Sequence, residues 1–125
     1  MQPVSQQQII EHLERKLGIG IPVYNGAAIL HYDNDQKVSL EFANQSSLFT
    51  IHTAVSNVSA MSLDTFKMQD ILKLNSRIDL LQGGWLGIHQ ESNSLRYFLS
   101  IPLQFATPDM ILHIINLILS IKQEI

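Results

Sequence analysis

The segment TPDMILHIINLILSI, residues 107–121, decides the fold because it contains the most apolar run of the chain. Thr107 is a good helix N-cap, Pro108 suits the first helical position, and Asp109 complements the helix dipole. The polar residues of the predicted helix fall at spacings of four, three, four and three, in one narrow stripe: Asp109, His113, Asn116, Ser120 and Gln123. A helix that is apolar on its other sides must be covered there. We therefore expect it to pack across a β-sheet as the main core element.

Five segments upstream of this helix predict the strands of that sheet. Residues 37–43 alternate cleanly, with Val38, Leu40 and Phe42 on one face and polar side chains on the other. Polar turns are predicted on both sides of this segment, at residues 33–36 and 44–46. The other strand-like segments are residues 27–32, 48–55, 85–90 and 95–101. The first three segments indicate an antiparallel meander with one wet face.

Two more helices complete the pattern. Residues 6–17 are preceded by a capping box of Ser5 and Gln8, they carry apolar residues at helical spacing, and Gly18 ends them. A second helix is expected to begin near Ser62 or Asp64 and to run to Asn75. The predicted order is therefore α-β-β-β-α-β-β-α. This is an α+β fold with a twisted, largely antiparallel sheet packed by helices, in a single domain over residues 1–125.

The composition excludes several classes of function. Of the 125 residues, 46% are apolar and only 15% are charged, against a typical charged share of about 25%. The net charge of −3 gives no basic field for nucleic acid or anionic lipid, and the absence of cysteine excludes thiol catalysis. The most apolar run has 12 residues, whereas a membrane span needs about 20. No signal peptide is visible, so we expect a cytoplasmic protein with no membrane or nucleic-acid partner.

No pattern typical of an active site or a cofactor site is found. Five histidines are present, but none has a partner at metal-motif spacing, so we expect surface or rim histidines and no metal: His12, His31, His52, His89 and His113. Residues 33–44 lack the glycine and the glutamate that an EF-hand loop requires. Gly83-Gly84 lacks the lysine and the helix of a phosphate loop, so it indicates close backbone packing at the start of a strand. We expect a binding module without enzymatic activity or cofactor.

The second half of the chain carries a family resemblance. The segments DILKLN (70–75), GGWLGI (83–88) and LRYFLSIPL (95–103), followed by the apolar C-terminal helix, resemble the class I type III secretion chaperones. That family, typified by the Tir chaperone, has a leucine-rich second helix, a glycine-led fourth strand and a fifth strand ending near Ile-Pro. The similarity in element order covers essentially the whole chain. It implies a bacterial cytoplasmic homodimer that binds a secreted effector and presents it to the secretion apparatus, without enzymatic activity, ATP or metal.

The resemblance also implies two sets of site residues. The family's dimer contact, made by the second helix with the fourth and fifth strands, maps onto Phe66, Met68, Ile71, Leu72, Leu74 and Trp85. The effector segment of such chaperones lies in extended form along grooves near the first helix and the first three strands, which maps onto Ile9, Leu13, Leu17, Ile29, Leu40, Phe42 and Phe49. Ordinary packing in the monomer core remains an alternative for both sets.

Two other functions remain open from the sequence. The first is a small α+β protein-binding module, regulatory or scaffolding, that is unrelated to secretion. The second is a small enzyme whose site is assembled from dispersed histidine and aspartate residues. A neighbouring gene for a large protein with a disordered N-terminus favours the chaperone. A reproducible metal content, or a reaction with generic substrates, favours the enzyme.

Overall fold

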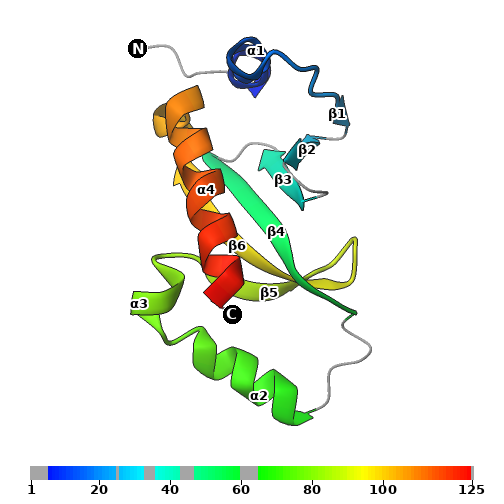
Figure 1. Ribbon diagram of the computed structural model, residues 1–125, viewed down its shortest axis with the longest axis vertical. Helices are drawn as coiled ribbons and strands as arrows, with labels where there is room; N and C mark the ends of the chain where they lie inside the picture. The colour runs from blue at the N-terminus through cyan, green and yellow to red at the C-terminus, as the bar shows by residue number, and fades with distance from the viewer. Residues whose placement is uncertain (1–5, 25, 33–35, 43–46, 60–64, 125) are drawn as a thin grey trace.

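The computed structural model of the protein describes residues 6–24, 26–32, 36–42, 47–59 and 65–124 (Figure 1). Six strands form one antiparallel sheet in the order β1-β2-β3-β4-β6-β5. The strands are β1 (Val23–Tyr24), β2 (Ala27–Tyr32), β3 (Gln36–Phe42), β4 (Leu48–Ser59), β5 (Trp85–His89) and β6 (Ser94–Pro102). The helices are α1 (Gln6–Leu17), α2 (Thr65–Leu74), α3 (Ile78–Leu81) and α4 (Pro108–Glu124), with a short 3-10 turn η2 (Leu103–Phe105). The α+β class and the predicted element order are confirmed, with three short elements added: β1, α3 and η2.

Helix α4 packs across the sheet, as its composition predicts. It runs over β4 and β6 in Figure 1, and it contacts both strands. Thr107 caps the helix, because its Oγ1 accepts a hydrogen bond from the backbone N–H of Met110 at 3.2 Å. The side chains that α4 buries are Ile111, Ile114, Ile115, Ile118 and Ile121. The predicted polar stripe is exposed along its whole length. Among the described helices, none is long and apolar enough to cross a lipid bilayer.

Helix α1 begins and ends where the sequence predicts. Gly18 adopts φ +69°, a left-handed conformation that favours glycine, and its N–H bonds the carbonyl of Glu14 at 2.8 Å. The carboxylate of Glu14 then accepts the N–H of Ile21 at 2.8 Å, which fixes the chain on its way to β1. The predicted Ser5 cap lies outside the described residues.

β1 and α3 are not predicted by the sequence, because they are too short to show a period. β1 pairs only two residues with β2. α3 has four residues and is closed by Gln82 in a left-handed conformation. Strand β4 is longer than predicted, and its pairing with β6 shifts register between Ala54 and Ser59. The start of the second predicted helix, residues 62–64, lies outside the described residues.

The sheet has one core face and one outer face. Val38, Leu40 and Phe42 of β3 are buried on the core face, which confirms the predicted alternation. Gly84 starts β5 against this core. A Cβ atom there would collide with the Tyr97 hydroxyl and the Phe98 carbonyl, which confirms close backbone packing. Side chains that alternate with the core residues point to the outer face, where a cluster of polar side chains lies.

Candidate functional site

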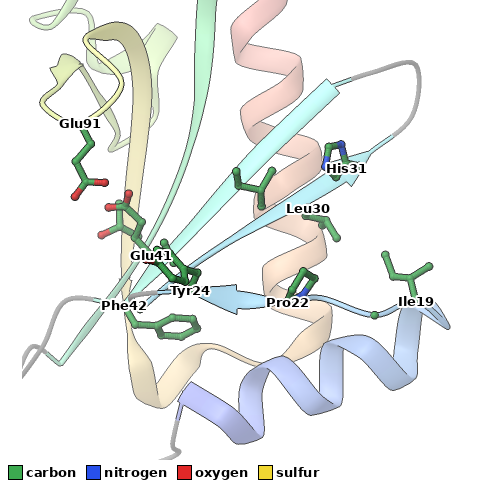
Figure 2. A pocket seen from close by; sticks show the side chains of 13 residues that line it. Ile19, Pro22, Tyr24, Leu30, His31, Glu41, Phe42 and Glu91 are labelled. Atoms are coloured by element: carbon green, nitrogen blue, oxygen red, sulfur yellow. The ribbon is translucent and has the colours of Figure 1, made fainter.

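A groove of about 810 Å³ lies beside β1 and β2, next to the segment that connects them to α1 (Figure 2). Its exposed apolar lining includes Ile19, Tyr24 and Ile29, and Tyr24 is 80% exposed. Pro22 and Phe42 also line it. A concave surface that leaves large apolar side chains in water is typical of a binding site for an apolar partner.

The groove adjoins an open edge of the sheet. β1 is the first strand in the sheet order, so its outer edge pairs with no described strand. An edge strand presents unpaired backbone N–H and C=O groups, which an added extended chain can satisfy. Apolar side chains and a free strand edge therefore lie together here.

The structure distributes the seven predicted effector-binding residues over core and surface. Five of them are buried, as in ordinary packing of α1 on the sheet: Ile9, Leu13, Leu40, Phe42 and Phe49. Leu17 is half-buried and Ile29 is 52% exposed. Ile29 and Phe42 line the groove. For all seven, contact with an effector stays a prediction.

The sequence analysis missed the other groove residues. Ile19, Pro22 and Tyr24 lie in the run GIGIPVY, residues 18–24. This run is apolar but has no helical or strand period, so it gives no structural prediction. The sequence feature that indicates a binding site is the group of large apolar side chains in and beside a connecting segment, because connecting segments are normally polar.

A second apolar surface lies on α2, α3 and β5. We name it the α2–β5 surface, and its exposed residues are Met68, Leu72, Ile78 and Trp85. Leu72 is 68% exposed and Ile78 is 79% exposed. Three of the predicted dimer residues, Met68, Leu72 and Trp85, belong to it. The predicted residues Ile71 and Leu74 are partly buried against the core, and the side chain of Phe66 lies outside the described ones.

Asn75 holds the end of α2 on β5. Its Oδ1 accepts the backbone N–H of Leu86 at 2.6 Å, and its Nδ2 donates to the Leu86 carbonyl at 3.0 Å. One side chain thus replaces the two hydrogen bonds that a neighbouring strand would make. This contact fixes the C-terminal end of α2 beside β5.

Four polar side chains converge on the outer face, and we name them the outer-face cluster: Glu41, His52, His89 and Arg96. Glu41 Oε1 lies 2.9 Å from His52 Nε2 and 3.0 Å from His89 Nε2. Arg96 Nε donates to His52 Nδ1 at 2.7 Å, and its Nη2 donates to Ser39 Oγ at 3.2 Å. The prediction of surface or rim histidines is wrong for His52, which is 1% exposed, whereas His89 is half-buried at the rim. His12, His31 and His113 are exposed as predicted.

The cluster resembles a metal site in composition but not in its hydrogen bonds. One ligand atom each from Glu41, His52 and His89 lies within 4.8 Å of the others. However, arginine can only donate, so Nδ1 of His52 must accept, and the proton of the neutral ring is on Nε2. That nitrogen then has no lone pair for a metal. The Nε2 atom instead faces the carboxylate of Glu41 at 2.9 Å.

Burial and charge set the protonation of the cluster. Burial lowers the pKa of His52, and Arg96 and His89 lower it further, while Glu41 opposes them. Burial raises the pKa of Glu41, but the hydrogen bonds and charges of His52 and His89 outweigh it, so the net shift is downward. At neutral pH the cluster therefore holds a carboxylate, a guanidinium and a neutral His52.

Ser92, His89 and Glu41 have the connectivity of a hydrolytic triad. Ser92 Oγ lies 2.9 Å from His89 Nδ1, whose other nitrogen faces Glu41. The amides beside the serine are already used, however. The N–H of Ser92 bonds His89 Nδ1 at 3.3 Å, and the N–H of Asn93 bonds the His89 carbonyl at 2.7 Å. The contacts therefore close the β5–β6 turn rather than prepare donors for an oxyanion.

Aromatic rings connect the outer-face cluster to the α2–β5 surface. His52 packs on Phe98 with ring centroids 4.9 Å apart, and Phe98 stacks on Trp85 at 5.6 Å with an interplanar angle of 9°. Glu41, at the other side of the cluster, lines the groove. The outer face thus carries a continuous set of contacts from the groove to the α2–β5 surface.

Solved structures share this fold. The HopA1–SchA chaperone–effector complex matches with a TM-score of 0.74 and 15% identity, over 98% of this chain and 97% of that chain. The ExsC–ExsE complex matches with a TM-score of 0.72 and 12% identity, over 92% and 86%. The Yersinia pestis type III secretion chaperone SycH, bound to a stable fragment of YscM2, matches with a TM-score of 0.68 and 12% identity, over 96% and 98%.

The family is shown by the sequence itself. No curated protein matches the sequence significantly. The family model described as the Tir chaperone protein (CesT) family, in contrast, matches residues 8–123. This range includes every described strand and nearly all of α1 and α4. The chain therefore belongs to the Tir chaperone protein (CesT) family.

Proposed function

We propose that this type III secretion chaperone binds the N-terminal chaperone-binding segment of a secreted effector in extended form. It acts in the bacterial cytoplasm, keeps that segment soluble and secretion-competent, and presents the complex to the secretion apparatus. The observation that carries the proposal is the apolar groove beside the open edge of β1. The family membership and the chaperone–effector complex among the solved relatives support it.

The chemistry of the groove suits an extended segment. Backbone hydrogen bonds to an edge strand tolerate many sequences, while pockets for alternate side chains give selectivity. Ile19, Tyr24 and Ile29 offer apolar surface that the bound segment would cover. Ordering a flexible segment costs conformational entropy, so a long contact is needed for affinity. The mechanism is the masking of apolar effector surface, without catalysis.

We also propose that the chaperone is a homodimer joined through the α2–β5 surface. Four large apolar side chains lie exposed on neighbouring elements, which favours a protein interface over solvent. Asn75 ties α2 to β5, so the exposed residues Met68, Leu72 and Trp85 are presented together. A second copy with the same surface would cover them symmetrically.

The test is the mass in solution by light scattering, alone and after co-expression with the protein encoded next to this chain. A species near twice the chain mass that protects an N-terminal fragment of the neighbour from protease supports both proposals. Ile29→Asp should abolish capture and keep the dimer, since it places a charge in the groove. Ser120→Asp, which adds the same charge on the exposed stripe of α4, is the matched control. A monomer that captures nothing contradicts the proposals.

A further inference from the structure

The groove has a charged end that apolar recognition does not explain. Two carboxylates line it, Glu41 from β3 and Glu91 from the turn between β5 and β6. Figure 2 shows the Glu91 side chain directed toward Glu41. Among the described residues that line the groove there is no lysine or arginine. A cationic side chain that enters this part of the groove is attracted to both carboxylates.

Glu41 is held in place for this role. Its Oε1 is fixed by His52 Nε2 at 2.9 Å and by His89 Nε2 at 3.0 Å, from two neighbouring strands. These contacts also keep the group ionised, since they lower its pKa. A carboxylate whose position and charge are set before binding loses little entropy when it meets a cation.

The one cation of the outer-face cluster makes no hydrogen bond at this end of the groove. Arg96 donates to His52 Nδ1 and to Ser39 Oγ, so its guanidinium is engaged on the far side of the His52 ring from Glu41. It does not line the groove. The groove therefore presents apolar surface at Ile19, Tyr24 and Ile29, and carboxylates at Glu41 and Glu91.

We propose that the groove selects effector segments in which a lysine or arginine side chain stands among apolar residues, and that Glu41 and Glu91 bind that side chain. The inference rests on the proposed function, because it assumes that the groove holds the effector. It adds the chemical class of the partner. Charge complementarity of this kind excludes segments with an acidic residue at the same place, because three carboxylates would then meet.

Selection of random peptides tests the inference without knowledge of the effector. Phage-displayed 15-residue peptides are selected on the immobilised full chain and, in parallel, on the Ile29→Asp and Glu91→Lys variants. Peptides that the wild type retains and Ile29→Asp does not are those that the groove binds. Among them we expect lysine or arginine to be enriched at one position and acidic residues to be depleted there. Glu91→Lys should reverse this preference.

One selected peptide is then titrated by fluorescence anisotropy. It is synthesised with an acetylated N-terminus, so that only side chains carry the positive charge. Glu91→Gln should weaken its binding about two- to fivefold, as for a partly exposed ion pair, and the loss should shrink in high salt. Asp79→Asn, which removes a carboxylate from α3 outside the groove, is the matched control. Glu91 is the first choice for substitution because Glu41 also supports the outer-face cluster.

The outcomes separate the two proposals. If no peptide distinguishes the wild type from Ile29→Asp, the groove itself is not a binding site and the proposed function fails. If groove-dependent peptides are found but carry neutral or acidic residues at every position, the inference is overturned. It is also overturned if Glu91→Lys leaves their charge preference unchanged. In both cases the groove is still a binding site.

Discussion

Arg96 Nε on β6 lies 2.7 Å from Nδ1 of His52 on β4, so a guanidinium donates to an imidazole that is 1% exposed. The arrangement requires a neutral ring, because a proton on Nδ1 would remove the acceptor and place two cations in contact. The other ring nitrogen faces Glu41. The fold thus holds a neutral histidine between a fixed cation and a carboxylate, and this determines how its stability responds to acid.

The chain should lose stability as the pH falls below about 6.5, the ordinary pKa of histidine. Burial lowers the pKa of His52 in the folded chain, so below that pH the unfolded chain binds more protons, and the free energy of unfolding falls until the folded pKa is reached. The lowered pKa of Glu41 adds a further loss below its ordinary value of 4.5. Urea denaturation at a series of pH values from 8 to 4 measures this.

The variant His52→Gln removes the titrating group and should flatten the profile between pH 8 and pH 5. His113→Gln is the matched control, because His113 is exposed on the polar stripe of α4. A profile that is equally steep in His52→Gln and in the wild type contradicts the assignment of the acid sensitivity to His52.

Gly84→Ala should destabilise the fold strongly. The added methyl group would collide with the Tyr97 hydroxyl and the Phe98 carbonyl, and the carbonyl belongs to the paired strand β6. Overpacking of this kind costs about 1–3 kcal/mol. Gly20→Ala is the control, since the nearest atom to its new Cβ lies 3.9 Å away on the Glu14 side chain. Urea denaturation compares the two, and an equal cost in both variants would contradict the steric argument.

The sequence predicts those parts of the fold whose signal is local. The cap at Thr107, the polar stripe of α4 and the alternation of β3 each arise within one element, and the structure confirms them. The four-residue helix α3 and the two-residue strand β1 have no full period to detect.

The sites were harder to predict because their residues meet only in the folded sheet. The outer-face cluster takes one side chain each from β3, β4, β5 and β6, so no spacing in the sequence indicates that His52 is buried. The burial of Phe49 and Leu13 likewise depends on how the helices and the sheet pack together, which an apolar pattern alone does not determine. In the sequence, apolar residues of the core face cannot be distinguished from apolar residues of a groove. Only the folded structure shows which of them are buried.

Asn75→Ala should loosen α2 from β5 and destabilise the fold by about 1–3 kcal/mol, because it leaves the N–H and the carbonyl of Leu86 without their partners. Hydrogen exchange of the Leu86 amide should become faster. Asn75→Asp keeps the acceptor for that N–H and loses only the donor, so it should protect the amide better than alanine does. Identical exchange in the two variants would contradict the role assigned to Asn75.

Leu72→Glu should convert the proposed dimer to a monomer without unfolding it. Leu72 is 68% exposed on α2, so the substitution buries no charge within the chain, but in the dimer it would place a carboxylate in an apolar contact. Sedimentation equilibrium measures the mass, and circular dichroism checks that the helix content is kept. Gln69→Glu adds the same charge at an exposed polar position of the same helix, and it tests whether charge on α2 is itself disruptive. If Leu72→Glu remains a dimer of unchanged affinity, the dimer uses another surface. The α2–β5 surface, with Trp85 stacked on Phe98, then needs a different partner.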